Sequence, residues 1–346
     1  MRTLDFCGAL REALTQEMER DEAVHVFGVG VPTTERIFGS VTGLEERFGR
    51  ARVFDTPISE DAMTGFALGA AIGGLRPVHI HIRVDFLILA MNQLINMVST
   101  MSYATRGTMK VPLVIRVVVG RGFGQGYQHS KSLHSLFTHI PGLKVIAPTT
   151  PRDAKGLLIA AMRDNNPVVF IEHRWLYWAS EDVPEESYEI PIGPGRVLRE
   201  GKDLTVVGTS WMNIEALKAA EIVERRGVHI EVVDPRTLAP FDDTVAVESV
   251  RKTGHCIVAD NDWVESGFGA EVAARVSEKC FGALRSPVKR IGFAHTPCPT
   301  VRYLENEFYP NAVTIIRAAE AQLGLEPMDL SKDDFYSHER RFKGPF

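Results

Sequence analysis

Cysteine is scarce in this chain, and its spacing excludes two common kinds of stabilised small domain. Among 346 residues there are four cysteines, which are far apart and form no C-x-x-C pair: Cys7, Cys256, Cys280 and Cys298. A disulfide framework needs closely spaced cysteines in a short secreted chain, and a structural zinc site needs paired Cys or His ligands. We therefore expect reduced thiols in a cytoplasmic protein.

Long apolar runs and an excess of basic charge are also lacking. The apolar stretches are shorter than the roughly 20 residues that span a bilayer, and the N-terminus lacks the apolar core of a signal peptide. The 44 acidic residues outnumber the 39 basic ones, which gives a net charge of -5. Chains that bind nucleic-acid backbones are usually basic. We expect a soluble protein that binds neither membranes nor nucleic acids.

Several motifs that identify common enzyme classes are absent. The sequence has no P-loop, no H-E-x-x-H and no G-x-S-x-G, and the glycines of the loop 120–128 do not follow the G-x-G-x-x-G spacing. Simple interpretations as a nicotinamide enzyme, a P-loop ATPase, a zinc protease or a serine hydrolase therefore lose weight. On its own, the glycine-rich loop is as consistent with a turn after a strand as with a binding site.

The sequence does contain a regular alternation of apolar, β-branched runs with helical runs. The first residues, with Leu10, Leu14 and Met18 at helical spacing, predict an amphipathic helix. The first half then predicts strands over 24–28, 77–84, 112–119, 144–148 and 167–173, and helices over 60–73, 87–105 and 151–163. Such alternation is typical of a parallel sheet covered by helices.

The pattern breaks over 180–202, where a stretch rich in Pro, Glu and Gly predicts a linker with a short hairpin. It restarts with strands over 204–210, 230–235, 255–260 and 287–292, and helices over 213–226, 242–252 and 269–281. We expect the α/β class with two parallel-sheet domains. The expected limits are a first domain at 1–185, a linker at 186–202, a second domain at 203–327 and a polar tail at 328–346.

The strongest chemical signal is DTPISE, residues 55–60, which follows a short strand and opens a helix. Ser59 is a candidate N-cap, and Glu60 would then lie in the first turn. Glu60 could simply complement the helix dipole, an effect of about 0.3–1 kcal/mol. The helix that follows, AMTGFALGAAIGG, is apolar almost all round and is therefore expected to be buried. A carboxylate at its head would be poorly solvated, and such a group can share a proton with a heterocycle.

Together with its neighbours, this segment resembles a known family. DTPISE is followed in order by GFALGAAIGGLRPV, DF at 85–86, YQHS at 127–130, HIPGLKVIAPTTPRDAKGL at 139–157 and RDNNPVVFIE at 163–172, and the second half adds VVDPRTLAPFD, VRKTGHCIVADN and GFGAEVAARVSE. These motifs are similar to those of the β subunit of the 2-oxoacid dehydrogenase E1 component, of the pyruvate or branched-chain type. The family belongs to the transketolase-like thiamine diphosphate enzymes. The resemblance implies a pyrimidine-binding domain followed by a transketolase C-terminal domain.

The resemblance also implies roles for individual residues. Glu60 would contact N1′ of the thiamine aminopyrimidine and, by sharing a proton there, activate the coenzyme toward the keto carbon of the substrate. Ile58 would lie at the cofactor, Phe86 would pack on the aminopyrimidine ring, and His129 would act on the bound intermediate. Taken singly, Phe86 is as well explained as a core residue, and His129 as polar surface.

Two metal sites follow from the same resemblance. A monovalent cation, K⁺, would be bound largely through carbonyls at Leu113, Ala161, Met162, Asp164 and Asn166. Thiamine diphosphate also needs Mg²⁺ held by hard oxygen ligands, which family members supply with a G-D-G…N segment. No G-D-G occurs in this chain. We therefore expect an E1 α-type subunit to supply that site in an α₂β₂ heterotetramer, and this chain to be inactive alone.

Two places depart from the family pattern. Over 78–84 the side chains alternate, and His79, His81 and Arg83 share a face that either meets solvent or a subunit, or carries function. In the functional alternative, Arg83 holds an anionic group at the substrate mouth, since a guanidinium pairs bidentately with carboxylate or phosphate. Lys131 and His134 stand where the family commonly has Gln and an acidic residue, which leaves the substrate and the docking of a lipoyl carrier open.

The leading hypothesis is an oxidoreductase subunit. With its partner, the chain would decarboxylate a small 2-oxoacid and transfer the acyl group to lipoyllysine of an E2 partner. The first alternative is a non-oxidative two-subunit carboligase or transketolase-like enzyme that forms an acyloin or a ketose. A noncatalytic partner-binding subunit ranks lower, because Glu60, Phe86 and His129 are all present.

Overall fold

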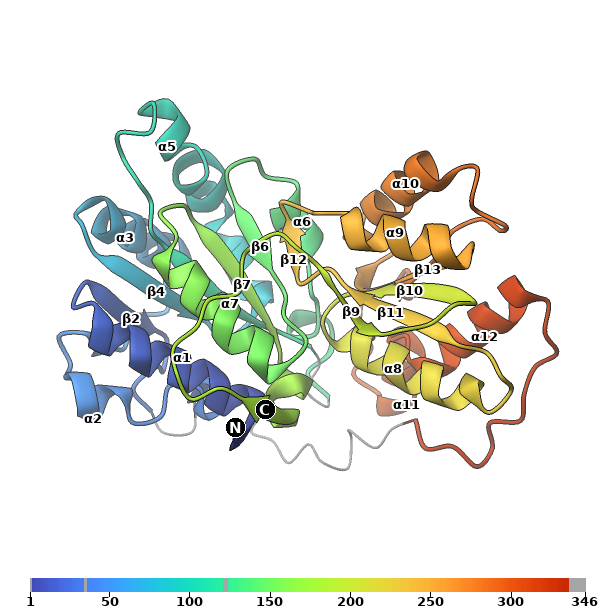
Figure 1. The fold of residues 1–346 in the computed structure, drawn as a ribbon. Coiled ribbons are helices and arrows are strands. Elements are labelled where there is room, and N and C mark those ends of the chain that lie inside the picture. Colours follow the sequence, from blue (N-terminus) through green and yellow to red (C-terminus); the bar gives the residue numbers. More distant parts are fainter. Residues whose placement is uncertain (1, 34–35, 121–123, 336–346) are drawn as a thin grey trace. The chain divides into compact units, whose positions relative to one another are not determined.

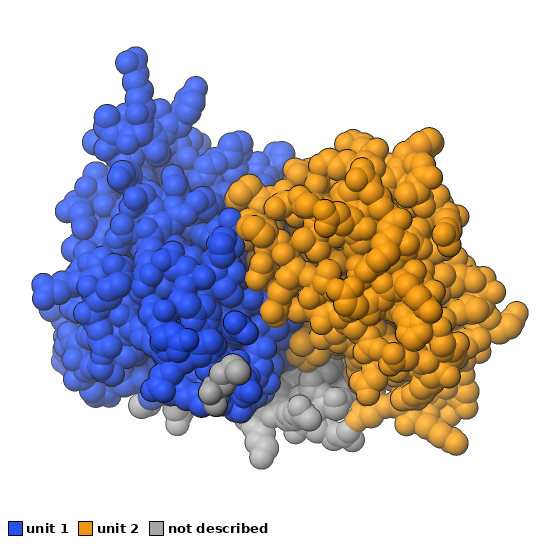
Figure 2. All heavy atoms as spheres, viewed as in Figure 1, with its two compact units in different colours: residues 1–120, 131–192, 345 blue, residues 121–130, 193–344, 346 orange. Residues whose placement is uncertain are grey.

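The computed structural model describes residues 2–33, 36–120 and 124–335, which form two compact units. The first unit contains residues 2–120 and 131–192, and the second contains residues 124–130 and 193–335 (Figure 2). Positions 34–35, positions 121–123 of the glycine-rich loop and the part of the expected tail from position 336 onward lie outside the described residues. Each unit contains a mainly parallel sheet, which confirms the predicted fold class.

The first unit alternates strands and helices along the chain, as the apolar pattern predicts. Its strands are β1 (Arg2–Asp5), β2 (Val24–Gly28), β3 (Val53–Phe54), β4 (Arg76–His81), β5 (Val114–Val119), β6 (Lys144–Ile146), β7 (Val168–His173) and β8 (Ser180–Val183). Its α-helices are α1 (Phe6–Arg20), α2 (Leu44–Phe48), α3 (Glu60–Ile72), α4 (Val84–Leu87), α5 (Met101–Ala104), α6 (His134–Thr138) and α7 (Pro151–Arg163). Shorter helical turns are η1 (Arg36–Gly39), η2 (Ile88–Ala90), η3 (Gln93–Val98) and η5 (Arg174–Trp178).

The main sheet of this unit runs in the order β6-β7-β5-β4-β2-β3, and each neighbouring pair is parallel. Every residue of β5 and β7 is buried, as expected for central strands covered on both faces. Helices α1 and α7 lie side by side (Figure 1), and the Arg163 guanidinium of α7 pairs with the buried Glu17 of α1. This packing fixes the sheet whose strand ends carry the candidate site.

The predicted helix over 87–105 is wrong as a single element. The chain forms α4, the 3-10 turn η2, the π-helical segment η3 and α5, and the two halves Val84–Ala90 and Gln93–Ala104 meet at 61°. Within η3, the Ser99 N–H bonds the Leu94 carbonyl five residues earlier. Hydroxyl groups then bond carbonyls four residues earlier, Ser99 to Ile95 and Thr100 to Asn96. Such bonds compete with the regular helix. They lie in the second half, whereas the 61° break lies between Ala90 and Gln93.

The second unit is a smaller α/β unit that begins with the turn η4 (Gly126–Gln128). Its strands are β9 (Arg196–Arg199), β10 (Leu204–Gly208), β11 (Ile230–Asp234), β12 (Thr237–Ala239), β13 (Cys256–Trp263) and β14 (Lys289–Phe293). Its helices are α8 (Trp211–Glu224), α9 (Thr244–Thr253), α10 (Phe268–Cys280), α11 (Arg302–Phe308) and α12 (Ala312–Leu323). The sheet order is β14-β13-β10-β11-β9, parallel except for β9.

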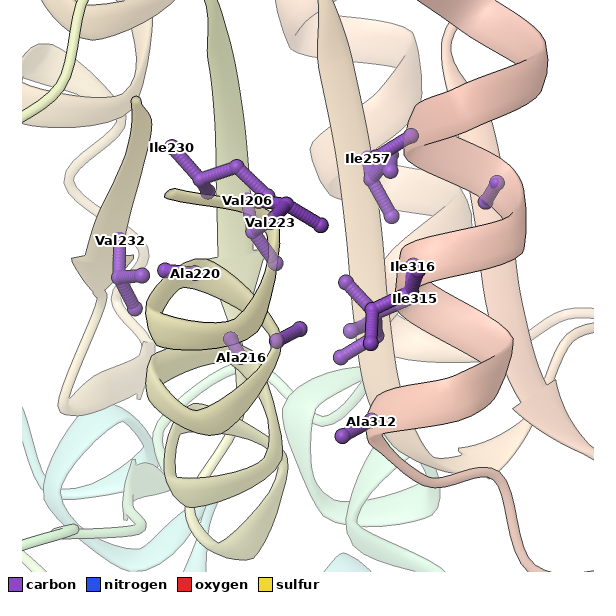
Figure 3. Close-up of a cluster of buried hydrophobic side chains, with 14 of the residues drawn as sticks. Val206, Ala216, Ala220, Val223, Ile230, Val232, Ile257, Ala312, Ile315 and Ile316 are labelled. Carbon is purple, nitrogen blue, oxygen red and sulfur yellow. The ribbon is translucent and has the colours of Figure 1, made fainter. Parts of the chain in front are cut away.

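The core of the second unit is formed by α8 and α12 against this sheet (Figure 3). Small residues on α8, such as Ala216 and Ala220, let the helix approach the strands, and Ile315 and Ile316 of α12 fill the space beside them. Val206 of β10 and Ile257 of β13 contribute from the sheet. Each of these side chains is fully buried.

The hairpin expected within 180–202 is wrong. The strand β8 pairs antiparallel with β1 at the N-terminus of the first unit, and β9 pairs antiparallel with β11 in the second. The two strands of this stretch therefore belong to different sheets. Their partners lie far away in sequence, so a local pattern cannot show the pairing.

All four cysteines are free thiols in buried positions. Burial raises the pKa of Cys7 and of Cys256 to about 12. Among the described residues, none of the helices is by itself both long and apolar enough to cross a membrane, and the bent pair at 84–104 satisfies that length and composition only when its two halves are joined.

Candidate active site

The turn before Glu60 is fixed by the side chain of Asp55. The Asp55 carboxylate accepts hydrogen bonds from the backbone N–H groups of Gly30, at 2.6 Å, and Thr56, at 2.9 Å. Gly30 lies just beyond β2, so one carboxylate joins the ends of two neighbouring parallel strands. Open α/β sheets bind ligands at the carboxyl ends of their strands. Glu60 follows this turn as the first residue of α3.

Ser59 is the N-cap of α3, as the sequence predicts, although its side chain makes no capping hydrogen bond. Glu60 and Asp61 form an acidic first turn, where the helix dipole favours negative charge. Glu60 is half-buried rather than enclosed. Glu60 thus begins a helix that packs on β4 and keeps part of its surface exposed.

The expectation that α3 is buried all round is wrong for the chain on its own. Thr64, Ala67, Leu68 and Ala71 are buried, and the helix contacts β4. On its other side Phe66 is 51% exposed and Ile72 is 38% exposed, and Ile58, just before the helix, is 79% exposed. The apolar composition of α3 predicts that both of its sides are covered in the functional protein. It does not tell whether this chain or a second chain covers each side.

Phe86 is half-buried in α4, directly after β4. Its N–H donates to the carbonyl of Arg83, the N-cap of this helix, at 3.2 Å. In the sheet, β2 lies between β4 and β3. Glu60 and Phe86 therefore follow strands on either side of β2, and the fold brings both predicted residues to the carboxyl edge of one sheet.

The alternation predicted over 78–84 stops at His81, because β4 ends there. His79 and His81 are 3% and 6% exposed, so the interpretation of this strand face as solvent-facing is wrong. The two rings meet edge to face with centroids 4.2 Å apart, and His79 also packs on Phe27. Burial lowers the pKa of His79 to about 4 and the pKa of His81 well below its usual value. Both rings are neutral at pH 7.

Arg83 is buried as well, at 3% exposure. Its guanidinium Nη1 donates to the carbonyl of Gly120, 2.7 Å away, just beyond the end of β5. The guanidinium thus bonds the protein's own backbone at the end of a neighbouring strand. Its expected role as a ligand for an anionic substrate stays a prediction.

His129 belongs to the second unit, unlike the residues described so far. It ends the turn η4 and is half-buried. Gly126 in that turn has a φ of +60°, and a Cβ there would lie 2.4 Å from Thr300 Cγ2, so the close packing requires glycine. The Tyr309 hydroxyl donates to the carbonyl of Ser130 at 2.6 Å. The residues on both sides of His129 are therefore held within the second unit.

Lys131 and His134, which the sequence marks as departures from the family, lie in the first unit. The Lys131 ammonium pairs with the Asp85 carboxylate at 2.7 Å, and His134 is buried. Burial raises the pKa of Asp85, and the hydrogen bond from Lys131 opposes that rise. Asp85 is a residue to which the sequence assigned no role, although it stands in the DF motif beside Phe86.

Two basic side chains of this chain, Arg76 and Lys144, contact residues that are expected to bind a monovalent cation. The Arg76 guanidinium donates to the carbonyls of Met162, at 2.9 Å, and Asp164, at 3.1 Å. The Asp164 carboxylate pairs with Lys144 and accepts from the backbone and side chain of Asn166. Burial raises the pKa of Asp164, but these hydrogen bonds outweigh it and keep the pKa low.

The other two expected cation ligands also use their carbonyls in the backbone. Leu113 accepts from the Val168 N–H, and Ala161 accepts from the Asp164 N–H. Four of the five expected ligands thus offer backbone carbonyl oxygens, and a carbonyl oxygen can accept a second partner. A cation bound there would share two carbonyls with Arg76.

Two known protein families match this chain, one over its first part and one over its second part. The family described as the transketolase pyrimidine binding domain matches residues 2–178. The family described as the transketolase C-terminal domain matches residues 193–315.

Three curated relatives are similar over nearly their whole length. The β subunit of acetoin:2,6-dichlorophenolindophenol oxidoreductase from Cupriavidus necator is 39% identical over 92% of this chain and 97% of the relative. The pyruvate dehydrogenase E1 β subunit of Staphylococcus epidermidis is 38% identical over 93% and 99%. The 2-oxoisovalerate dehydrogenase β subunit of Bacillus subtilis is 38% identical over 90% and 96%.

Among solved structures, one titled as a split gene transketolase, inactive β4 tetramer, superposes with a TM-score of 0.74. It is 22% identical and covers 94% of this chain and 99% of that one. At this identity the likeness concerns the fold alone.

Proposed function

This chain belongs to the transketolase-like enzymes as a β subunit of the E1 type, and on that premise we propose that it forms half of a thiamine diphosphate site. The observation that carries the proposal is the arrangement at one sheet edge of the first unit, where Glu60 begins α3 and Phe86 follows β4. The other half would come from an α-type subunit, since this chain lacks the G-D-G segment that binds Mg²⁺ and diphosphate.

The residues present fit the pyrimidine end of the cofactor. Glu60 is a half-buried carboxylate on a rigid helix and would hold a proton at N1′ of the aminopyrimidine. Phe86 and the exposed Ile58 would supply apolar surface for the ring. When bound, thiamine diphosphate supplies an electron sink for cleavage of a bond next to a carbonyl carbon. The exposed apolar residues around Glu60 suit a site that a second chain completes.

We propose a small 2-oxoacid as the substrate, with decarboxylation and transfer of the acyl group to lipoyllysine of an E2 partner. His129, a half-buried imidazole in a segment held on both sides, would move a proton at the substrate. The named relatives act on pyruvate, 2-oxoisovalerate and acetoin at nearly equal identity.

Glu60→Gln tests the catalytic half of the proposal. The amide keeps the size of the side chain but cannot take up the proton, so the complex with the α-type subunit should assemble normally and lose nearly all turnover. Asp61→Asn, the neighbouring first-turn carboxylate, is the matched control and should retain activity. Full activity of Glu60→Gln in the assembled complex would refute the proposed site.

Product analysis tests the reaction. The reconstituted complex would be given pyruvate, branched 2-oxoacids and acetoin in turn, with an artificial electron acceptor or a lipoyl domain. Release of CO₂ from a 2-oxoacid, with reduction of the acceptor or formation of an acyl-dihydrolipoyl product, supports the proposal. Formation of an acyloin or a ketose without acceptor reduction contradicts it. Turnover of acetoin alone contradicts the proposed 2-oxoacid substrate.

The monovalent-cation site at Leu113, Ala161, Met162, Asp164 and Asn166 is proposed for K⁺. A cation that binds only the folded chain raises its stability by mass action. The melting temperature of the chain should therefore be higher in potassium chloride than in choline chloride of equal ionic strength. Equal melting temperatures would remove this site from the proposal.

A further inference from the structure

The first unit contains a cleft of about 400 Å³ that is lined by β1, α1, α2 and the turn before α2. A volume of this size lies in the range of small-molecule sites, about 300–1,000 Å³. None of the residues proposed for the cofactor or for K⁺ lines it. Its polar lining consists of three arginines, one acidic residue and two threonines: Arg2, Arg11, Arg47, Glu12, Thr15 and Thr42.

The three arginines bring positive charge to the cleft from three different elements. Arg2 belongs to β1, Arg11 to α1 and Arg47 to α2. A guanidinium is always charged, and its planar fork of donors pairs with carboxylate or phosphate through two parallel hydrogen bonds. A cleft whose charges are mainly of one sign attracts ligands of the opposite sign. The lining therefore favours an anion.

Arg11 supplies a charge that no carboxylate neutralises among the described residues. Its guanidinium Nη1 donates to the carbonyl of Gly39, 3.3 Å away. That bond is long for an N–H donor and is made to a neutral acceptor. Arg11 is exposed, so its donors are open to a ligand.

Glu12, the one acidic side chain among the described residues of the lining, is shared by two cations. Its Oε2 pairs with Arg2, and its Oε1 lies 2.6 Å from the ammonium of Lys155, whose side chain is fully buried. One negative charge thus faces two positive ones. Arg47 pairs with the exposed Glu19. Exposed ion pairs contribute only about 0–1 kcal/mol, so an anionic ligand can compete with them.

We propose that this cleft binds a small anion that carries at least two phosphate or carboxylate groups, with Arg2, Arg11 and Arg47 as its cations. Two or more acidic groups on one ligand can pair with separate guanidinium groups, which a single phosphate cannot do as well in a cleft of this volume. The site is separate from the proposed thiamine diphosphate site. The inference therefore does not rest on the proposed function.

Calorimetric titration of the full chain with inorganic tripolyphosphate, and separately with citrate, tests the site. The first probe carries phosphates and the second carboxylates, so the tighter ligand shows which group the cleft prefers. We expect a Kd below about 1 mM for at least one of them at low salt. Binding should weaken strongly in about 1 M sodium chloride, where the screening length falls to about 3 Å.

Arg11→Gln should weaken binding at least about tenfold, because it removes charge-assisted hydrogen bonds to the anion. Arg47→Gln, on another element, is a second variant with the same expected direction. Both side chains lie at the surface, so the melting temperature without anion should stay close to that of the original chain. The matched control is Arg50→Gln, since Arg50 is 91% exposed, pairs with Glu45 and does not line the cleft. It makes the same change in net charge and should bind the anion like the original chain.

Thermal unfolding gives a second readout. A ligand that binds only the folded chain stabilises it by mass action, so the anion should raise the melting temperature of the original chain and of Arg50→Gln more than that of Arg11→Gln. Binding of neither probe at millimolar concentration would overturn the proposal. Equal affinities of Arg11→Gln and Arg50→Gln would overturn it as well, because they would reduce the effect to general attraction by surface charge.

Discussion

Burial keeps the neighbouring rings of His79 and His81 neutral on the inner part of β4. His79 packs on Phe27, which in turn stacks on Phe54 and meets the edge of Phe66 on α3. An imidazolium inside such an aromatic row would lose its hydration without gaining a counter-ion. The pair should therefore make the stability of the first unit depend on pH.

The pKa of His79 falls from 6.5 to about 4 on folding, so the unfolded chain binds the proton more tightly. Its contribution to stability is complete above about pH 6.5 and is lost as the pH falls toward 4. Between pH 7.5 and 5 the loss from His79 alone should be about 2 kcal/mol. In urea unfolding, His79→Phe should lower the pH dependence over this range by about that amount, while the buried His81 keeps its own share. The exposed His139→Phe should behave like the original chain, and an unchanged slope in His79→Phe would contradict the account.

For single residues, the sequence predicted the place in a helix or strand better than the burial and the contacts of the side chain. The predicted positions of Ser59 as N-cap and Glu60 in the first turn are confirmed, although the Ser59 side chain makes no capping hydrogen bond. The burial of His79 and the bond from Arg83 to Gly120 depend on neighbouring strands, which the sequence does not specify. The roles of Glu60, Phe86 and His129 stay predictions.

Among the elements, α12 has the most complete N-terminal cap. The Asn311 side chain accepts from the N–H groups of Val313 and Thr314, and the Thr314 hydroxyl accepts in return from the Asn311 N–H. The Ala312 N–H donates to Glu215 of α8 at 2.9 Å. The cap thus also fixes the contact between the two helices of the second core.

Asn311→Ala removes two of these acceptor contacts and should lower the free energy of unfolding of the second unit by about 1 kcal/mol. Asn311→Asp keeps the acceptor and adds a charge that the helix dipole favours, so its stability should stay close to that of the original chain. Urea denaturation followed by tryptophan fluorescence is a suitable measurement, since Trp211 bonds the same Glu215 that accepts from Ala312. Equal stability of the Ala and Asp variants would show that the cap contributes nothing.

Helices and strands were predicted correctly where residues near in sequence, such as capping residues, determine where they begin and end. The helix predicted over 151–163 begins at Pro151 behind the N-cap Thr150 and ends at Arg163, as expected from its capping residues. The helix predicted over 87–105 is wrong as a single element, because the chain bends by 61° between Ala90 and Gln93 and continues as a π-helical segment. Its hydrophobic spacing alone gave no sign of the bend.

At the scale of the whole molecule, the first unit leaves a set of large apolar side chains exposed between positions 58 and 109. They come from the turn before α3, from α3 itself, from the bent helical stretch and from the turn after it: Ile58, Phe66, Ile72, Ile88, Leu89, Met97, Tyr103 and Met109. Apolar surface of this kind is common at interfaces between chains. The proposed α-type partner would cover at least the part next to Glu60.

Phe66→Glu places a charge at a half-exposed position on α3 and should weaken assembly with the α-type subunit at least about tenfold, which corresponds to about 1.4 kcal/mol. Its melting temperature as an isolated chain should fall only modestly, because Phe66 is 51% exposed although its ring meets Phe27 and Phe54. Glu46→Lys, at an exposed position on α2, is the control and should assemble normally. Native mass spectrometry of mixed subunits measures the outcome, and unaltered assembly of Phe66→Glu would exclude α3 from the interface.

The sequence predicted two mainly parallel α/β units, and the structure confirms them. Periodicity and the break in composition near 190 were sufficient for that. The strand order was not predictable, because it depends on crossover connections between distant segments. The assignment of residues 124–130 to the second unit was not predictable either, because these residues lie in sequence between two parts of the first unit.

All four native cysteines are buried. This has a practical consequence for attaching a dye to residues 124–130, which include His129. With Cys7 and Cys256 shifted to a pKa of about 12, little thiolate is present at neutral pH, so maleimide dyes should react slowly with the original chain. A cysteine introduced at Tyr127, which is 57% exposed, would then carry nearly all of the label. Fluorescence anisotropy of that dye could follow the segment in solution without removing any native sulfur.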